Sequence, residues 1–570
     1  MSSSKQDNEI DVHWAVRIPM RDGIHLVGAI YKPSGTAPVP VILSMTPYSI
    51  DTYHERANYF AYNGYAFALV DVRGRGNSEG EFIPFLVDKQ DGYDAVEWLA
   101  QQSWCDGQVA MWGGSYAGMN QWTTLRESPP HLRTVVPAAS AQFYTGGNPM
   151  RGPGKMINAL KWNVLTSEKT TGWNFNSQWD YWAQKARFCY LNHIPFHQID
   201  RVMTNQENAH FQTWMSHPPH DPYWRQLIFS PEQYQNIDIP ILTIAGHYDD
   251  SQRGSLHTYR LHMQYGSPQA KENHYLVIGP WDHAGTRTPR REVGGLHFSE
   301  AALLDLNRLH VEWYDFVMKG GPKPVFFKKQ VAYYVMGAEE WNYTEELATL
   351  SQPRRYYLHS AYGNANDVYH SGSLDNIEPQ DSQPEGYTYD PLDIRPAELE
   401  REEIKDYLTD QRWALNLYGN GLIYHTAPFE KDTEITGWAK LALWLELDVP
   451  DTDFEVILSE ILPDGSHIKL SDDFMRARYR ETQWAEKLVT PGEINCYEFS
   501  AFTFFSRLVK RGSRLRLLVH CPNYIFWEKN YNSGGYVGFE TAQEARTTHV
   551  KLYHDASRPS YLELPIAREG

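Results

Sequence analysis

The sequence predicts an α/β protein with two additions, a helical insertion inside the α/β part and an all-β domain after it. Short apolar runs alternate with helical patterns, an aromatic-rich segment interrupts them, and strand-length pieces without helices follow. A chain of 570 residues is also too long for one compact core. We therefore expect an α/β domain in residues 1–150 and 230–345, a helical cap in 151–229 and an all-β domain in 346–570.

The α/β part begins with a strand–turn–strand pattern. Ala15–Pro19 and Leu26–Tyr31 flank the turn residues Arg21-Asp22-Gly23, which indicates a β-hairpin. Short runs rich in Val, Ile, Leu and Ala follow, and such runs are typical of strands buried on both faces of a mostly parallel sheet. These predicted strands are Val39–Met45, Tyr65–Val72, Val109–Trp112, Thr134–Ala138, Ile239–Ala245 and Tyr275–Ile278.

Two helices of the α/β part are predicted from helical spacing of apolar residues. Asp94–Gln101 is the first. Ser299–Met318 is the second, with Ser299 as its N-cap and Gly320-Gly321-Pro322 as its stop signal.

The insertion and the C-terminal third differ from the α/β part in composition. Aromatic residues crowd between residues 151 and 229, which favours a helical lid over a pocket. Beyond residue 345, many short strands suggest a β-sandwich of the jelly-roll type, and Ser371–Glu403, rich in Asp, Glu, Pro and Ser, is predicted to be a long surface loop. The clearest predicted strands of this domain are Lys440–Leu447, Phe454–Ile461, His467–Leu470 and Arg514–Val519.

Charge and cysteine content exclude several classes of protein. The formal net charge is −18 and no Lys/Arg block occurs, so we expect no nucleic-acid partner. The four cysteines form no CxxC pattern, which predicts free thiols, no zinc site and no disulfide framework. The polar N-terminus has no apolar signal-peptide core, and no window reaches the roughly 18 apolar residues of a membrane span. A cytoplasmic protein without membrane association is the expectation.

The segment Val109 to Gly118 carries the first sign of chemistry. Its strand runs through Gly113 and Gly114 to Ser115 and then into a helical pattern. The nucleophilic serine of an α/β-hydrolase occupies such a tight, strained turn. Ala117 stands where the usual G-x-S-x-G motif has its second glycine, and Gly118 follows. Taken alone, this pattern is more often an ordinary turn, so a catalytic role for Ser115 depends on finding an acid and a histidine to accompany it.

Two later strands supply those partners in the chain order Ser, Asp, His that this fold uses. Asp249 follows the strand Ile239–Ala245, and His283 follows Tyr275–Ile278. Ligands of open α/β sheets bind beyond the carboxyl ends of the strands, so the three side chains are expected at one sheet edge. We interpret Ser115 as nucleophile, His283 as general base and Asp249 as the residue that orients it.

At this point the sequence resembles the cocaine esterase-like hydrolases, which are related to the X-Pro dipeptidyl-peptidases and the α-amino-acid ester hydrolases. The resemblance spans nearly the whole chain. It rests on Pro47-Tyr48, Val72 to Gly80, Trp104 to Gly107, Gly114-Ser115-Tyr116, Tyr248-Asp249, Gly279 to His283, Met336-Gly337, Glu340-Trp341, Tyr387 to Pro391 and Pro450 to Phe454. It implies an α/β-hydrolase domain, a helical cap and a C-terminal jelly roll.

The resemblance also assigns roles to residues. It implies the triad Ser115, Asp249 and His283, and an oxyanion hole made of the Tyr48 hydroxyl and the backbone N–H of Tyr116. Asp250 is an alternative orienting acid. Asp282 is a poorer one, because adjacent residues of an extended segment point in opposite directions.

The substrate pocket is less well defined by the sequence. Phe143, Tyr144 and Trp162 stand where the sheet continues into the cap, and they are candidates for lining an acyl pocket. His217-Pro218-Pro219-His220 is too weak a pattern for a metal site, so no metal and no cofactor are expected.

Several functions remain open. The α-amino-acid ester hydrolases hold a substrate ammonium with carboxylates, whereas here Asp250 is followed by Ser251, Gln252 and Arg253. X-Pro peptidases usually carry a further N-terminal domain before the hydrolase. An esterase acting on a small-molecule ester with a bulky or aromatic acyl group is therefore preferred. An amide or peptide acylase, such as a β-lactam acylase or an X-Pro-type aminopeptidase, is the alternative, and a non-catalytic carbohydrate-binding protein is a distant one. The C-terminal domain could also support a homo-oligomer.

Overall fold

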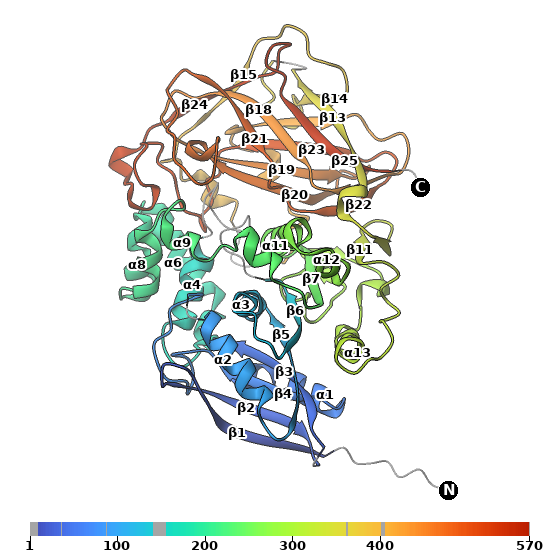
Figure 1. Ribbon diagram of the computed structural model, residues 1–570. Helices are drawn as coiled ribbons and strands as arrows, with labels where there is room; N and C mark the ends of the chain where they lie inside the picture. Colours follow the sequence, from blue (N-terminus) through green and yellow to red (C-terminus); the bar gives the residue numbers. More distant parts are fainter. Residues whose placement is uncertain are drawn as a thin grey trace.

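The computed structural model describes residues 9–35, 37–86, 88–140, 156–360, 363–400 and 405–568. Figure 1 shows three parts: the α/β domain at the bottom, the helices of the insertion beside it, and the C-terminal β-domain on top. An α/β-hydrolase domain with a helical insertion and a C-terminal all-β domain is what the sequence predicts, and the architecture is confirmed.

Ten described strands form the sheet of the α/β domain, in the order β1-β2-β4-β3-β5-β6-β7-β8-β11-β12. The pairs from β4/β3 to β8/β11 are parallel, whereas β1/β2, β2/β4 and β11/β12 are antiparallel. The strands are β1 Ile10–Pro19, β2 His25–Pro33, β3 Val39–Thr46, β4 Ala66–Asp71, β5 Cys105–Gly114, β6 Leu132–Ala138, β7 Ile241–Tyr248, β8 His274–Asp282, β11 Val331–Val335 and β12 Glu340–Thr344. The predicted N-terminal hairpin is β1/β2.

The central strands have buried, largely apolar middles because both faces of the sheet are covered. In β5, Val109 and Met111 belong to one hydrophobic cluster, while Ala110 and Trp112 belong to another. The first cluster includes residues of α2 and α3, and the second includes residues of α1 and α13, so these helices lie on opposite faces. The helices are α1 His54–Tyr62, α2 Asp88–Ala100, α3 Tyr116–Leu125, α11 Gln252–Tyr265, α12 Pro268–Glu272 and α13 Leu306–Met318.

The helix predicted from Ser299 begins later than expected. Ser299 caps a short 3₁₀ turn, Glu300–Ala302, and α13 begins at Leu306 with Asp305 as its N-cap. The Ser299 hydroxyl also contacts the Tyr334 hydroxyl at 3.0 Å, and the Ser299 amide donates to Glu339. These contacts with distant residues attach Ser299 to the sheet, and the helix begins at the next good cap, Asp305.

The insertion between β6 and β7 is helical. Its aromatic residues form a small core with the α/β domain and the β-domain. The described helices are α4 Met156–Thr166, α5 Trp173–Asn176, α6 Trp179–Leu191, α7 Ile199–Thr204, α8 Ala209–Ser216, α9 Pro222–Arg225 and α10 Pro231–Gln235.

The C-terminal domain contains thirteen described strands linked in one hydrogen-bonded network. The predicted loop Ser371–Glu403 is wrong in part, because two strands, β14 and β15, lie within it. Both pair with distant strands, β14 with β13 and β16 and β15 with β24. The strands are β13 Ser351–His359, β14 Gly372–Asp375, β15 Glu385–Tyr389, β16 Gly421–Thr426, β17 Thr433–Gly437, β18 Lys440–Glu446, β19 Asp453–Ile461, β20 His467–Arg476, β21 Ile494–Phe499, β22 Phe505–Val509, β23 Arg514–His520, β24 Thr548–Tyr553 and β25 Tyr561–Ala567.

The β-domain is joined to the α/β domain by specific polar contacts. The side-chain amide of Gln252, the first residue of α11, both donates to and accepts from the backbone of Phe504, at 2.8 Å in each case. The next residue, Arg253, forms an ion pair with Asp472. These contacts fix the segment that directly follows the predicted catalytic acid.

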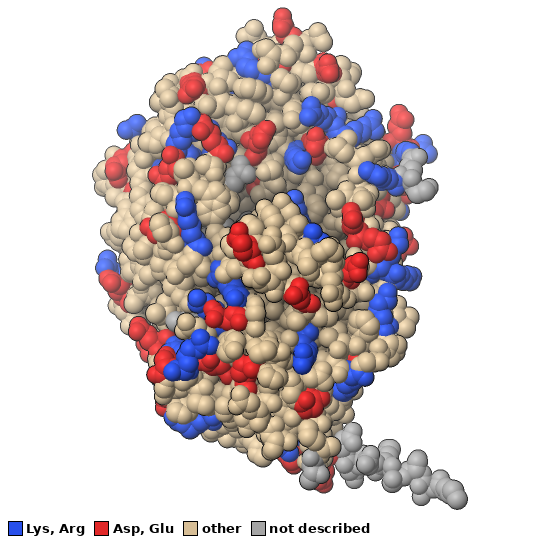
Figure 2. Space-filling view, viewed as in Figure 1, with Lys and Arg blue, Asp and Glu red and all other residues tan. Residues whose placement is uncertain are grey.

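The surface carries charges of both signs (Figure 2), and the cysteines are unpaired. Figure 2 shows acidic and basic side chains interspersed over the face drawn, without a large block of one sign. The four cysteines are free thiols. No helix in the described part of the chain is long and apolar enough to cross a membrane.

Candidate active site

Ser115 occupies the strained turn that the sequence predicts between β5 and α3. Its backbone has φ 61° and ψ −121°, a region that non-glycine residues rarely adopt and that costs about 1–3 kcal/mol. A Cβ added to Gly113 would lie 2.6 Å from the Ala117 side chain, and one added to Gly118 would lie 2.7 Å from the Ala138 carbonyl oxygen. Small residues are therefore required on both sides of the serine, and here Gly118 takes the close approach to the neighbouring strand.

Backbone hydrogen bonds connect this turn to the ends of the neighbouring strands. The Ser115 amide donates to the Ala138 carbonyl at the end of β6, and the Ala139 amide donates to Ile244 in β7. In turn β7 pairs with β8, with Tyr248 opposite Asp282. Ser115, Asp249 and His283 thus follow the carboxyl ends of β5, β7 and β8 at one edge of the sheet.

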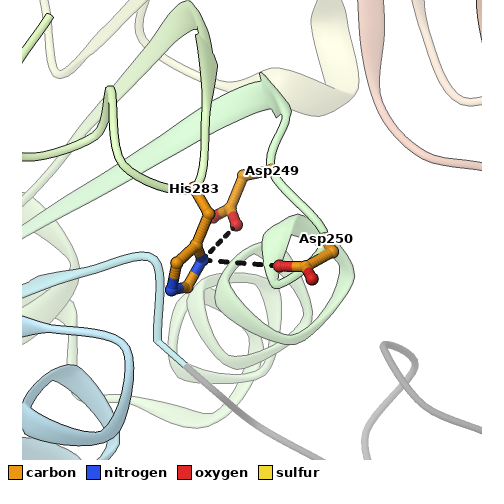
Figure 3. A group of neighbouring side chains, drawn as sticks. All are labelled: Asp249, Asp250 and His283. Atoms are coloured by element: carbon orange, nitrogen blue, oxygen red, sulfur yellow. Dashed lines mark hydrogen bonds and ion pairs between the residues drawn. The ribbon is translucent and has the colours of Figure 1, made fainter. Parts of the chain in front are cut away.

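The structure brings Asp249 and His283 into direct contact. His283 Nδ1 lies 2.7 Å from Asp249 Oδ1, and this pair is drawn in Figure 3. The Asp249 side chain is fully buried, and its Oδ1 also accepts a hydrogen bond from the Ser251 amide at 3.0 Å. A buried carboxylate on Nδ1 leaves Nε2 as the nitrogen that can take a proton.

Asp250 is a second carboxylate near the same imidazole. Its Oδ1 lies 3.4 Å from His283 Nδ1, and its side chain is about half exposed (Figure 3). The longer distance and the exposure favour Asp249 as the orienting acid. Asp282, the other alternative, instead accepts a hydrogen bond from the Gly285 amide at 2.8 Å within the turn that follows β8.

The electrostatic surroundings raise the pKa of His283 above its ordinary value of 6.5. Burial lowers this pKa, but the charge of Asp249 and its hydrogen bond outweigh that effect, with a smaller contribution from Asp250. The arrangement therefore stabilises the imidazolium that a general base becomes once it has accepted a proton.

Tyr48, just after the end of β3, lies beside the serine. Burial raises the pKa of its phenol, and hydrogen bonds with Trp162 and Ser115 lower it in part. The Trp162 indole N–H donates to the Tyr48 hydroxyl oxygen at 2.9 Å. Because a hydroxyl has only one proton, this contact leaves that proton free to be donated elsewhere.

The backbone N–H of Tyr116 is the other predicted oxyanion donor. Tyr116 is the first residue of α3, and the first N–H groups of a helix have no acceptor within the helix. Its hydroxyl donates to Asp88 at 2.6 Å, and its ring stacks on Phe85 at 4.6 Å between centroids. The side chain thus anchors the start of the helix.

The three predicted pocket residues differ in outcome. Phe143 and Tyr144 lie outside the described residues. Trp162 is described, and its ring stacks on Phe85 and contacts the Tyr48 hydroxyl. Trp173, which was not among the predicted pocket residues, is 43% exposed, and its ring centroid lies 5.6 Å from that of Tyr48.

Sequence reasoning missed two residues near the site. Arg287 lies against Gly114, the residue before Ser115. Tyr407, from the C-terminal domain, lies close enough to Asp282 and Asp250 that, after burial, their charges raise the pKa of its phenol. No motif marks either residue, because one follows His283 in an ordinary turn and the other lies more than 120 residues away from it in the sequence.

Among the described residues, Asp249, Asp250 and His283 also form a cluster whose donor atoms lie within 4.8 Å of one another. Carboxylate and imidazole groups can bind metal ions. Here, however, Nδ1 of His283 is already bound to Asp249, and the cluster is the hydrogen-bonded acid–histidine pair described above.

Tyr48→Phe is expected to reduce kcat for an ester by about 10²–10³-fold, with a much smaller change in KM. The substitution keeps the buried ring and removes the hydroxyl donor, which acts mainly on the charged transition state. Steady-state kinetics measure this effect. Tyr53→Phe is the control, since the Tyr53 ring packs on Trp112 and its hydroxyl is not part of the predicted site. Equal activity of Tyr48→Phe and wild type would exclude the oxyanion role.

Comparisons with known proteins agree with this geometry. The family model "X-Pro dipeptidyl-peptidase (S15 family)" matches residues 22–285, and "X-Pro dipeptidyl-peptidase C-terminal non-catalytic domain" matches residues 327–563. The cocaine esterase of Rhodococcus sp. (strain MB1 Bresler) is 28% identical over 99% of this chain and 100% of its own length. The chain belongs to the cocaine esterase-like hydrolases of the S15 family.

Solved structures show the same fold over the whole chain. An aminopeptidase from the marine sediment archaeon Thaumarchaeota archaeon has a TM-score of 0.84 at 21% identity and covers 100% of this chain and 98% of its own. An α-amino acid ester hydrolase has a TM-score of 0.83 at 21% identity, with 99% and 98% covered. The resemblance recognised in the sequence is confirmed, and this cocaine esterase-like protein is a hydrolase.

Proposed function

We propose that this hydrolase cleaves carboxylic esters through an acyl-enzyme on Ser115. The observation that carries the proposal is the buried Asp249–His283 hydrogen bond of 2.7 Å, at the sheet edge where Ser115 occupies a strained turn. The cocaine esterase of Rhodococcus, which matches over its full length, supports an ester as substrate.

The reaction has two steps, acylation of Ser115 and hydrolysis of the acyl-enzyme. His283 Nε2 takes the Ser115 proton while Oγ attacks the ester carbonyl carbon, and the oxyanion is held by the Tyr48 hydroxyl and the Tyr116 N–H. The carbon–alkoxy bond then breaks and His283 returns the proton to the leaving alcohol. Water attacks the acyl-enzyme with the same base, which releases the carboxylic acid and restores Ser115.

Aromatic side chains beside Tyr48 support a bulky or aromatic acyl group. Trp162 and Trp173 both adjoin Tyr48, and Trp173 is partly exposed. Aromatic faces offer a large apolar contact area to a ring. An amide substrate would use the same machinery, so the relative rates for esters and amides are part of the test.

A fluorophosphonate probe tests the nucleophile. We expect wild type to be labelled at Ser115, as read by peptide mass spectrometry, and to hydrolyse 4-nitrophenyl esters faster than the matching 4-nitroanilides. Ser115→Ala should lose both properties. Ser128→Ala is the matched control, because Ser128 also has a positive φ, 49°, but lies beyond the far end of α3. A folded wild type that neither reacts with the probe nor hydrolyses the ester would disprove the proposal.

A further inference from the structure

Arg287 places a cation against the residue that precedes the candidate nucleophile. A Cβ added to Gly114 would lie 2.4 Å from Arg287 Nη1 and 2.6 Å from its Cδ, so the guanidinium stem covers the open face of that glycine. Consecutive Cα atoms are about 3.8 Å apart, so the guanidinium is also close to Ser115. Arg287 also lies close enough to His283 and Tyr48 for its charge to oppose, by a small amount, the rise in the pKa of each.

The backbone of Arg287 is held in place, which fixes where its side chain starts. Its amide donates to the Ala284 carbonyl at 3.1 Å, and its own carbonyl accepts a hydrogen bond from Arg56 at 3.1 Å. The flanking turn is closed by the Thr288 amide, which also donates to Ala284.

The guanidinium itself has donors to spare. Toward the described residues, it donates to the Thr286 hydroxyl oxygen at 3.5 Å, which is long for a hydrogen bond. Among the described residues, no carboxylate oxygen lies within 4.0 Å of a guanidinium nitrogen of Arg287, the distance of an ion pair. Guanidinium has five N–H donors, so this partly exposed side chain keeps donors available for an anionic ligand.

The charges around the site are arranged asymmetrically. Asp249 and Asp250 both lie on the Nδ1 side of His283, whereas Arg287 lies on the Gly114 side. An anionic group on a substrate is repelled by the first side and attracted by the second. The planar fork of arginine matches a carboxylate with two parallel hydrogen bonds.

We propose that Arg287 is a specificity-determining residue that binds a carboxylate of the substrate next to the scissile ester. This inference rests on the proposed function, because it assumes that the bond cleaved is the one Ser115 attacks. It narrows the substrate class to esters with an anionic group near the reacting carbonyl. That group can belong to the acyl part or to the alcohol part, and both have the same chemistry toward arginine.

Matched substrate pairs test the proposal. For the acyl side, the pair is 4-nitrophenyl hydrogen glutarate and 4-nitrophenyl pentanoate, which have the same acyl chain length and differ in a terminal carboxylate. For the alcohol side, the pair is 3-acetoxybenzoate and phenyl acetate. Spontaneous hydrolysis is subtracted, and the readout is the ratio of kcat/KM for the charged ester to that for the neutral one. Any loss common to both esters cancels in this ratio.

Wild type is expected to prefer the charged member of at least one pair. In Arg287→Met, which keeps the length of the stem, that ratio should fall by about 10–100-fold, the range of a hydrogen bond to a charged group. Arg287→Lys should retain part of the preference, since it keeps the charge and loses the fork. Arg133→Met is the control, because Arg133 is an exposed cation near the start of β6, at the opposite end of the strand from the site.

The possible results distinguish failure of the proposed role of Arg287 from failure of the proposed function. The pair whose ratio falls shows on which side of the ester the carboxylate binds. A ratio that Arg287→Met leaves unchanged in both pairs overturns the role of Arg287, and so does a wild type that prefers the neutral ester in both. Absence of fluorophosphonate labelling and of all ester hydrolysis in wild type would instead defeat the proposed function. If Arg287→Met does not fold, two other measurements test the proposal. One is the set of kcat/KM ratios of Arg287→Lys, and the other is the inhibition of wild type by benzoate compared with benzamide. Weaker inhibition by benzoate than by benzamide overturns the proposal.

Discussion

His283→Ala is expected to reduce kcat for 4-nitrophenyl esters by about 10⁶-fold, with the protein still folded. The ring is held by Asp249 at 2.7 Å and is about one third exposed, so its removal takes away the base without opening a buried cavity. Without a base, the Ser115 hydroxyl is a weak nucleophile, and what remains comes from binding and the oxyanion donors. Pre-steady-state and steady-state kinetics on the purified variant measure the loss.

His297→Ala is the matched control for this variant. His297 is 73% exposed and lies fourteen residues further along the same segment, and its nearest acid is Glu292 at 3.5 Å. The control should retain wild-type kcat. If His283→Ala keeps more than a small fraction of the activity, another group must act as the base.

The pH profile of the wild type tests independently whether His283 is the base. Only neutral His283 can accept the serine proton, so kcat/KM should rise with pH and level off above the pKa of the ring. Because Asp249 and Asp250 outweigh burial, the midpoint should lie above 6.5. Asp250→Asn removes one of the charges that raise this pKa and should shift the midpoint to lower pH.

Asp249→Asn is expected to reduce kcat by about 10⁴-fold while KM changes little. The buried carboxylate accepts from Nδ1–H and so keeps Nε2 unprotonated; an amide in its place can donate to Nδ1 and favour the wrong tautomer. The Ser251 amide donates to the same oxygen, so an amide nitrogen at that position also removes this hydrogen bond, and stability must be measured together with activity. Steady-state kinetics and a thermal unfolding curve together show whether catalysis or folding is affected.

Asp250→Asn is the matched comparison for Asp249→Asn. Asp250 is the next residue, has the same side chain and lies within ion-pair distance of the same ring, but it is about half exposed and 3.4 Å away. We expect its kcat to change by only a few-fold, because solvent screens an exposed charge pair. A larger loss for Asp250→Asn than for Asp249→Asn would reverse the assignment of the orienting acid.

Most of the α/β framework could be predicted because the local sequence carries the signal. The part of a strand that is buried on both faces is mostly apolar, and each predicted run lies on or overlaps an observed strand from β3 to β8. Ser115 was recognisable because its strained turn tolerates only small neighbours, and Gly113, Ala117 and Gly118 supply them. Asp249 and His283 were recognisable because each follows a predicted strand in the required order.

Elements whose signal depends on distant partners were harder to predict. The strands β14 and β15 lie in a segment rich in polar residues and proline, and they exist because β13, β16 and β24 offer backbone hydrogen bonds to them. The start of α13 was misplaced for a related reason, since Ser299 is bound to Tyr334 and Glu339, residues of the sheet and of the turn that follows it.

The sequence by itself determined the order of the elements, the strained serine turn and the acid–histidine pair, because each depends on residues that are close along the chain or at strand ends. Only the tertiary structure decided that Trp162 donates to Tyr48, that Gln252 is bound to Phe504, and that Arg287 lies against Gly114. Those contacts join residues from separate elements, over 114, 252 and 173 positions of the chain respectively. Their geometry follows from the packing of elements that are distant in the sequence, which local propensity does not encode.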